Sequence, residues 1–339
     1  MSIAVAVSGG LDSLLALILL QERGSQVLAV HGRFLDADQS GAALERICRG
    51  LGVPFLELDL RSDFEERVIA PFVHAYLAGD TPNPCAACNP GMKFGLLFDA
   101  ARERGAEFLA TGHYVRLEQG RLLRGVDAAK DQSYFLSLVP LDRLERAVFP
   151  LGGLTKAAAR AELARRGLTP PLSRESQEIC FVPHDDYRAF LESRGLDLPG
   201  AGPVLLSDGR KIGQHRGLWR HTQGQRKGLG LSWPEPLYVL DKDPARNAVV
   251  VGPRSELAAW GCSVDRVNRL APQDAWPETV LVQTRYRQKA KPARFAARGQ
   301  GLALTFLEPQ TRPTPGQIAA LYTAEGQVLG GGIITAGQG

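Results

Sequence analysis

The sequence predicts an α/β protein, with a parallel-sheet domain at the N-terminus and two small β domains after it. Three observations support this fold class. Short apolar runs alternate with helical stretches over the first part of the chain, the stretch SGGLDS follows the first apolar run, and glycine, proline and short alternating runs dominate the remainder. A chain of 339 residues has the length of two or three domains. We place them at residues 1–197, 198–255 and 256–339.

The elements of the first domain follow from hydrophobic periodicity and from helix start and stop signals. Strands are predicted at residues 3–7, 27–31, 55–60 and 108–111. Helices are predicted at residues 12–23, 42–50, 64–77, 92–104, 155–166 and 186–194, the first of them closed by Gly24. The stretch GDTPNPCAACNPG is crowded with proline, asparagine and glycine, which predicts a loop. Strands that alternate with helices argue for a parallel sheet covered on both faces.

The later part of the chain has a sequence pattern typical of β hairpins. Runs such as PVLLSDGRKIG, LYVLDKDPARNAVVVG and QIAALYTAEGQVLGGGII alternate over short distances between turn residues. We see no internal repeat and no low-complexity tract.

Composition describes an ordinary globular protein, with 44% hydrophobic and 22% charged residues. No apolar run approaches the ~18 residues of a membrane span, and the N-terminus lacks the features of a signal peptide, so we expect a cytoplasmic protein with no membrane partner. Five cysteines in a long chain argue against a disulfide framework and favour reactive or metal-bound thiols. The net charge of +4 weakly favours an anionic partner.

The stretch SGGLDS, residues 8–13, predicts a phosphate site. A strand that ends in two glycines and enters a helix points free backbone N–H groups at a ligand, and the helix dipole favours an anion there. Ser8 and Ser13 add hydroxyl donors, and Asp12 would reach phosphate through a bridging magnesium ion. The alternative is a simple helix cap by Asp12 or Ser13, which accounts for one polar side chain but not for the whole hexapeptide.

AVSGGLDS also resembles the PP-loop of the N-type ATP pyrophosphatases, while the Walker and GxGxxG patterns are absent. The resemblance implies an adenine nucleotide alpha hydrolase-like domain that cleaves ATP between the α and β phosphates. It further implies that an acceptor oxygen is adenylated and that a nucleophile then displaces AMP.

Three cysteines are candidates for that nucleophile. Cys85 and Cys88 lie three apart in NPCAACN, and Cys180 lies in ESQEICF. A structural zinc site would need a second CxxC or a His pair, and neither is present. Cys180 could instead be a buried apolar residue between Ile and Phe. For Cys48 and Cys262, which have no partner nearby in the sequence, we expect an inert core position.

Several longer stretches occur in order and closely resemble the tRNA-specific 2-thiouridylases. They include AVSGGLDS, TPNPCAACNPGMKFG, ATGHYVRL, KDQSYFLS, SQEICF, GQHRGLWRHTQGQRKGLGL, YVLDKD, RYRQ and PGQIAALYTAEGQVLGGGII, and they span nearly the whole chain. The resemblance implies ATP-dependent thiolation at C2 of the wobble uridine of tRNA. It also implies a sulfur donor, such as a cysteine desulfurase or a sulfur-relay protein.

The resemblance further implies roles for individual residues. The nucleotide would contact Ala6, Val7, Ser8, Gly9, Gly10, Leu11, Asp12 and Ser13, with Leu35 and Gly112. Cys88 would be the nucleophile and Cys180 the carrier of the persulfide, with Asp12 as the magnesium partner. The tRNA would contact Asn83, Pro84, Cys85, His113, Lys130, Asp131, Gln132, Arg285, Tyr286 and Gln317.

Cys85 departs from much of the family, in which an acid precedes the nucleophile by three residues. Cys85, Cys88 and Cys180 together could hold a 4Fe–4S cluster with one iron open to bind hydrosulfide. Two sulfur routes are therefore expected to compete. In one, Cys180 carries a persulfide and Cys88 ends as its disulfide partner. In the other, all three cysteines are cluster ligands, and the CxxC slightly favours this route.

Two acid-free basic stretches predict a surface for RNA phosphates. RYRQKAKPARFAARG and RKIGQHRGLWRHTQGQRKG each contain six lysines and arginines, although a single charged run is usually only a solvated face. Trp219 or Tyr286 could stack on a base, and core packing is an equal alternative. Two competing functions also remain open: a PP-loop ligase or amidase that uses ammonia, and a non-catalytic tRNA-binding sulfur carrier.

Overall fold

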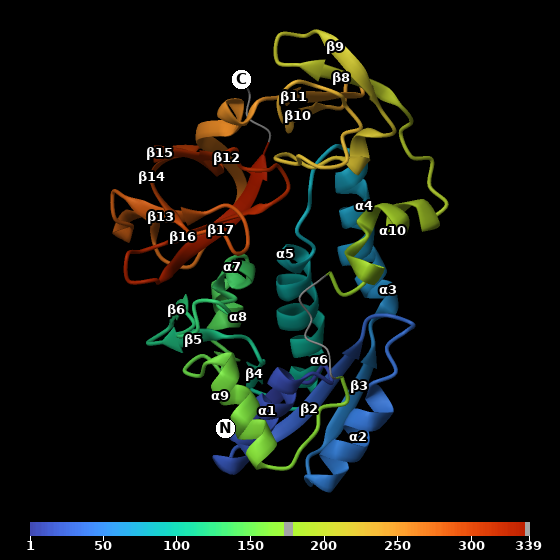
Figure 1. Cartoon of the computed structure of the whole chain (residues 1–339). Helices are drawn as coiled ribbons and strands as arrows, with labels where there is room; N and C mark the ends of the chain where they lie inside the picture. The colour runs from blue at the N-terminus through green and yellow to red at the C-terminus, as the bar shows by residue number, and fades with distance from the viewer. Residues whose placement is uncertain (173–178, 336–339) are drawn as a thin grey trace.

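A computed structural model describes residues 1–172 and 179–335 of the chain (Figure 1). Its N-terminal domain is built on a five-stranded parallel sheet of order β3-β2-β1-β4-β7. The strands are β1 (Ser2–Ala6), β2 (Gln26–Arg33), β3 (Phe55–Asp59), β4 (Phe108–Ala110) and the short β7 (Ala147–Val148). The predicted fold class is confirmed, and β7 is a strand that the sequence pattern did not indicate.

Alternate residues of the central strand face two separate apolar cores. Ile3 and Val5 pack with α1 (Leu11–Glu22), α2 (Gly41–Gly50) and α9 (Lys156–Arg165). Ala4 packs on the other face with Phe94 and Phe98. Both faces are therefore covered, as the continuous apolar run of the strand predicts. Thr155 caps α9 by accepting a hydrogen bond from the backbone N–H of Ala158.

Two longer helical segments contain π-helical turns. The first runs through α3 (Arg61–Phe64), η1 (Glu65–Ile69) and α4 (Ala70–Leu77), and the second through α5 (Cys85–Cys88), η2 (Asn89–Leu97) and α6 (Phe98–Glu103). The cysteine pair is therefore helical, and the prediction of a loop through residue 91 was wrong. The side chain of Asn83 accepts a hydrogen bond from the N–H of Cys85, and the carbonyl of Pro84 accepts one from Cys88, which starts the helix ahead of its expected position.

The remainder of the domain is a hairpin and short helices. These elements are β5 (Val115–Glu118), β6 (Arg121–Arg124), α7 (Ser133–Leu136), α8 (Leu141–Leu144), η3 (Pro183–Asp185) and α10 (Tyr187–Ser193). Asp186 caps α10 by accepting from the N–H groups of Arg188 and Ala189, which accounts for the predicted start of that helix.

The two β domains differ in architecture. The middle one is a four-stranded sheet of order β10-β11-β8-β9, with β8 (Gly202–Leu206), β9 (Lys211–His215), η4 (Leu218–Arg220), β10 (Tyr238–Asp243) and β11 (Ala248–Gly252). The last is a closed six-stranded barrel of order β12-β15-β14-β13-β16-β17. Its elements are η5 (Arg254–Leu257), β12 (Ala258–Arg269), η6 (Gln273–Ala275), β13 (Val280–Gln283), β14 (Lys291–Arg298), β15 (Gly301–Thr311), β16 (Ile318–Tyr322) and β17 (Val328–Thr335).

Both β domains pack against the end of the N-terminal domain where α4, α5 and α7 lie (Figure 1). Tyr134 of α7 shares one apolar core with Ile318 and Tyr322 of the barrel, and its hydroxyl donates to the carbonyl of Ile318. Trp219 of the middle domain packs into the aromatic core around Phe72 of α4. The three domains therefore share buried side chains instead of being joined only by linkers.

The turn after α4, residues 79–81, lies between the two β domains. The N–H of Thr81 donates to the carbonyl of Pro315, and the carbonyl of Thr81 accepts from the side chain of Gln317 at 2.8 Å. From the other side, the ammonium of Lys242 donates to the carbonyls of Asp80 and His221. This turn leads directly into the cysteine segment, so both β domains hold the chain that carries Cys85 and Cys88. None of the helices in the described part of the chain is long and apolar enough to cross a membrane.

Candidate active site

The stretch SGGLDS lies at the point of the sheet where the strand order reverses. From β1 the chain proceeds through β2 to β3 at one edge, and then returns to place β4 on the other side of β1. The loops that leave β1 and β4 therefore diverge at the carboxyl ends of the strands, the place where open α/β sheets generally bind their ligands. The geometry supports the predicted nucleotide site.

Within the loop, Ser13 stabilises the turn itself. Its hydroxyl accepts from the N–H of Ser8 at 3.1 Å and donates to the carbonyl of Gly10 at 3.0 Å. Gly9 has a φ of +79°, a conformation that other residues rarely adopt, so the glycine is needed for the turn. Ala6 ends β1, the N–H of Val7 donates to Val30, and Gly10 precedes α1, whose first residue is Leu11.

Asp12 has protein partners on both carboxylate oxygens. Lys156 donates from its ammonium to Oδ1 at 2.8 Å and to Oδ2 at 2.7 Å, and the hydroxyl of Tyr114 donates to Oδ1 at 2.7 Å. Lys156 starts α9 and its side chain is only 9% exposed, so the pair joins α9 to the nucleotide loop. Asp12, for which we expect a bridging magnesium ion, is thus paired in this structure with a lysine 144 residues further along the chain.

Gly112 lies directly against the nucleotide loop. A Cβ atom at this position would approach the carbonyl carbon of Asp12 to 2.8 Å and the N–H nitrogen of Ser13 to 2.9 Å. Any side chain here would displace the start of α1. The segment after β4 therefore lies against the loop of residues 8–13, and contact of Gly112 with a nucleotide stays a prediction.

Sequence reasoning did not identify His31 and Asp38. The ring of His31 lies 2.9 Å from the carbonyl of Val7 and 3.4 Å from the carboxylate of Asp38, which in turn accepts from Ser40. Burial opposes the charge of His31, but its hydrogen bonds to Asp38 and Val7 outweigh burial and raise its pKa. These residues support the nucleotide loop through the backbone of Val7. Leu35, expected at the nucleotide, follows β2 and packs with the aromatic core near α4.

The thiols of Cys85, Cys88 and Cys180 lie near one another. Burial raises the pKa of the Cys88 thiol to about 12, Lys93 lowers it, and the nearby thiols of Cys180 and Cys85 raise it further. Cys180 is the most exposed of the three, although burial of its sulfur still raises its pKa. Its neighbours Ile179 and Phe181 pack into the apolar core, so the segment is anchored while the thiol stays accessible.

The expected 4Fe–4S ligand set is not supported by this arrangement. Within residues 1–172 and 179–335, no group of three or more His, Cys, Asp and Glu side chains could hold a metal ion. The three thiols interact electrostatically, yet they do not converge on one point as cluster ligands must. Cys48 is buried in the core of the N-terminal domain, as expected, and Cys262 packs beside the barrel core.

The residues expected to contact tRNA fall into two groups. Asp131, Gln132, Arg285 and Gln317 make hydrogen bonds within the protein, to Arg124, Tyr114, Gln223 and Thr81 respectively, and His113 is buried with its ring 2.7 Å from the hydroxyl of Thr111. In contrast, Tyr286 is half-buried, with its ring centroid 4.4 Å from that of Phe135. Burial raises its pKa, and the nearby Cys85 thiol adds a smaller effect in the same direction. Trp219 is a core residue, so Tyr286 is the better candidate for stacking.

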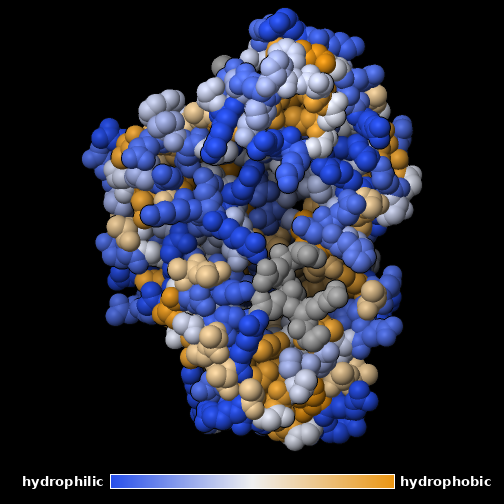
Figure 2. Space-filling view, viewed as in Figure 1, coloured by the Kyte–Doolittle hydropathy of each residue, from blue (hydrophilic) through white to orange (hydrophobic). Residues whose placement is uncertain are grey.

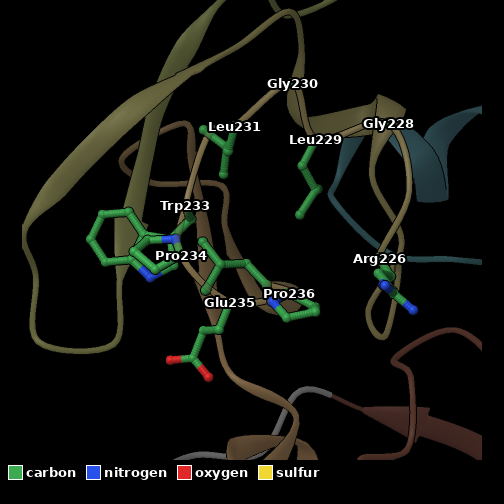
Figure 3. Close-up of a pocket in the computed structure, with 10 residues that line it drawn as sticks. Arg226, Gly228, Leu229, Gly230, Leu231, Trp233, Pro234, Glu235 and Pro236 are labelled. Atoms are coloured by element: carbon green, nitrogen blue, oxygen red, sulfur yellow. The ribbon is translucent and has the colours of Figure 1, made fainter.

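Hydrophilic side chains cover much of the face that the two β domains present in Figure 2. Exposed lysines and arginines of the basic stretches include Lys227, Arg285, Arg287 and Lys289. A separate surface hollow is formed by residues 226–237 of the middle domain, with Arg226 on the side opposite Trp233 (Figure 3). None of the residues that line it is a predicted site residue. The candidate reactive residues therefore lie away from this hollow.

The chain matches three family models in order. Residues 1–184 match one described as a tRNA methyl transferase HUP domain, residues 188–253 one described as a tRNA methyl transferase PRC-barrel domain, and residues 261–334 one described as an aminomethyltransferase beta-barrel domain.

Similar proteins carry a different name from these models. A protein of Nitratidesulfovibrio vulgaris strain Miyazaki F, named tRNA-specific 2-thiouridylase MnmA, is 56% identical, and the match covers 98% of this chain and 99% of that protein. Proteins of the same name from Oleidesulfovibrio alaskensis and Lawsonia intracellularis are 53% and 46% identical, with matches that cover at least 98% of each chain.

Proposed function

The chain belongs to the family of tRNA-specific 2-thiouridylases, and on this premise we propose that it is a tRNA-uridine 2-sulfurtransferase. It would use ATP to replace the C2 oxygen of the wobble uridine with sulfur, in the cytoplasm, where its tRNA substrate is found. The relatives at 46–56% identity over nearly the whole chain carry this proposal, because their name describes a complete activity and not a shared domain.

One structural observation supports it most directly. The three consecutive residues 112–114 lie between the nucleotide loop and the thiols: Gly112 contacts Asp12 and Ser13, Tyr114 donates to Asp12, and the ring of His113 lies within electrostatic range of Lys93 beside the cysteines. A base held over this segment would have the α-phosphate of ATP on one side and a sulfur on the other. Such a position is what an adenylation followed by sulfur attack requires.

In the first step, the C2 oxygen of uridine would attack the α-phosphate of ATP and release pyrophosphate. Backbone N–H groups of residues 8–10 and the N-terminus of α1 would hold the phosphates. Asp12 is the single carboxylate of residues 8–13, so it would be the ligand that this loop offers to the magnesium ion implied by the PP-loop family, beside its contact with Lys156. The ion would supply charge neutralisation at the phosphates.

In the second step, a persulfide on Cys180 would attack C2, and AMP would leave. The thiolate of Cys88 would then attack the Cys180 sulfur, which breaks the S–S bond, leaves sulfur on the base and joins the two cysteines in a disulfide. A sulfur donor, such as a cysteine desulfurase or a relay protein, would reload Cys180 once that disulfide is reduced. Cys180 is exposed and Cys88 is partly buried, which suits these two roles, because only the carrier must meet a second protein.

The test is formation of 2-thiouridine in tRNA, measured by mass spectrometry of digested nucleosides, with ATP and a persulfide donor. We expect product and AMP in equal amounts, and no product from Cys88→Ser or Cys180→Ser. Cys262→Ser is the matched control and should keep full activity, since this cysteine lies in the barrel.

The same assay separates the alternatives. An ammonia-using ligase would release AMP without tRNA and would tolerate both cysteine variants, and a sulfur carrier would release none. A methyl transfer, as the family models' description suggests, would require a methyl donor and would add a methyl group instead of sulfur. Iron-dependent activity of protein purified without oxygen, together with iron lost in Cys85→Ser, would favour the cluster route over the relay.

A further inference from the structure

The half-buried side chain of Lys93 is the common charged neighbour of the reactive pocket. Its ammonium lies within electrostatic range of the thiols of Cys85, Cys88 and Cys180, and of the ring of His113. These four groups come from three separate segments of the chain. Lys93 is therefore the cation that these four groups share, and we refer to this cluster as the reactive pocket.

The π-helical turn explains how Lys93 arrives there. In the η2 segment, Asn89–Leu97, the i→i+5 repeat places residues five apart on one face, whereas an α-helix would rotate them apart. Cys88 immediately precedes η2 and Lys93 is five residues later, so both lie on the face toward the pocket. Gly95 permits this geometry, because a Cβ there would approach the carbonyl oxygen of Pro90 to 2.8 Å.

Lys93 also has no acidic partner in the part of the chain that the structure describes. The ion pairs found there join other lysines and arginines to carboxylates, and none involves Lys93. A half-buried cation without a carboxylate is costly to bury unless an anion is bound there during function. The neighbouring groups that can supply an anion are sulfurs.

We propose that Lys93 is a positioning residue that holds the transferred sulfur as an anion in the pocket. This inference rests on the proposed function and deepens it by assigning a role that the sequence alone did not indicate. The thiolate of Cys88 and the terminal sulfur of a Cys180 persulfide both carry negative charge when they attack. Lys93 supplies the countercharge, so the buried sulfur can be ionised without water.

The experiment measures local charge directly and needs neither ATP nor tRNA. Cys88 of the full-length protein is alkylated with anionic iodoacetate and, separately, with neutral iodoacetamide, and modification is followed by fragment mass spectrometry. We take the ratio of the iodoacetate rate to the iodoacetamide rate. Both rates depend equally on the fraction of Cys88 that is thiolate, so the ratio reports only the local charge that the anionic reagent meets. Unfolded protein in guanidinium chloride gives the reference ratio.

In the native protein we expect this ratio to exceed the unfolded reference. Lys93→Met should lower the ratio about threefold or more, which is the effect expected for one nearby, partly screened charge. Lys93→Arg should keep the ratio, and Lys211→Met, an exposed lysine of β9, should leave it unchanged. Near-UV circular dichroism checks that each variant is folded, and Lys93→Gln replaces Met if that variant is not.

An unchanged ratio in folded Lys93→Met or Lys93→Gln would overturn the proposal, as would a ratio lowered equally by Lys93→Arg. A different result would count against the proposed function alone: the wild type forms no 2-thiouridine, while the alkylation ratio responds to the Lys93 variants as expected. The role of Lys93 as an anion-holding residue would then stand.

Discussion

At the level of single residues, the nucleotide loop depends on the ion pair between Asp12 and Lys156. Asp12→Asn removes the countercharge of a lysine whose side chain is 9% exposed, so the free energy of unfolding should fall by roughly 1–3 kcal/mol, a range reduced for the 34% exposure of Asp12. AMP release should be abolished while tRNA binding is nearly kept. Denaturant unfolding and an AMP assay check both effects.

The double variant Asp12→Asn/Lys156→Met is the matched control. Since it removes both charges, it should regain part of the stability lost in Asp12→Asn, although not the activity. This account would be contradicted if the losses in free energy of unfolding from the two single substitutions simply added in the double variant. Normal AMP release by Asp12→Asn would also contradict it.

His31 gives the loop a pH-dependent component of stability. Its pKa is raised in the folded protein, so its contribution is fully present below the ordinary histidine pKa and is lost as pH rises through the folded value. Burial opposes the charge of Asp38, but hydrogen bonds to His31 and Ser40 outweigh burial and lower its pKa to about 2. Asp38 therefore stabilises the fold above the ordinary aspartate pKa, and this stabilisation is lost as pH falls through the folded value.

We therefore expect the free energy of unfolding of the wild type, relative to His31→Gln, to decrease as pH rises from 6 through 8. Urea unfolding at matched ionic strength measures this difference. Parallel pH profiles of the two proteins would show that His31 does not carry the effect.

At the level of elements, the π-helical segment η2 determines where Lys93 lies relative to the cysteines of α5. Gly95→Ala would place a Cβ 2.8 Å from the carbonyl oxygen of Pro90, and should lower the free energy of unfolding by about 1–3 kcal/mol and reduce thiolation. Gly91→Ala, in the same segment, meets nothing within 4 Å and serves as the control. Thermal melts and the 2-thiouridine assay should separate the two, and equal behaviour would argue against a need for glycine at position 95.

Local patterns predicted the elements that depend on local sequence. The strands, α1 and the nucleotide loop follow from apolar periodicity and from two glycines at a strand–helix turn. The π-helical turns were missed because hydrophobic patterns read with a period of 3.6 do not indicate an i→i+5 repeat. The cysteine pair was assigned to a loop because Pro84 and Asn89 resemble turn residues, whereas Asn83 and Pro84 start a helix.

The site was predictable only where one segment carries it. Ser8 to Ser13 lie within one strand–helix turn, as predicted, while their role at a nucleotide stays a prediction. The partner of Asp12 lies 144 residues away, and Lys93 is one lysine among many until the fold places it beside three thiols. Asp131 shows the converse: its side chain is bound by Arg124 and Ser133, a role that its charge alone could not reveal.

At the level of the whole molecule, the exposed basic residues of both β domains should determine the salt dependence of tRNA binding. Lys227→Ala and Lys289→Ala together should weaken binding and lower the slope of log affinity against log salt by about two, because each substitution leaves one phosphate without its lysine. Arg285 is unsuitable for this test because its guanidinium bridges Gln223 and Thr314. A salt slope unchanged in the double variant would remove these lysines from the interface.

The turn held between the β domains should control how firmly the cysteine segment is fixed. Gln317→Ala removes the hydrogen bond to the carbonyl of Thr81, which is worth about 1 kcal/mol, so the segment should open more often and Cys88 should react with iodoacetamide several times faster. Gln300→Ala, at an exposed turn of the same barrel, is the control. Equal labelling rates would show that this hydrogen bond does not restrain the segment.

The hydrogen bond between Thr81 and Pro315 has a consequence for how the protein is made. Synthesis proceeds from the N-terminus, so the parallel sheet can form while the barrel is still unmade, but residues 79–81 gain this partner only when nearly the last strand has left the ribosome. A nascent or truncated chain would thus hold a nucleotide loop without a fixed cysteine segment. Under the proposed function, sulfur transfer would therefore have to wait until the barrel has folded against this turn.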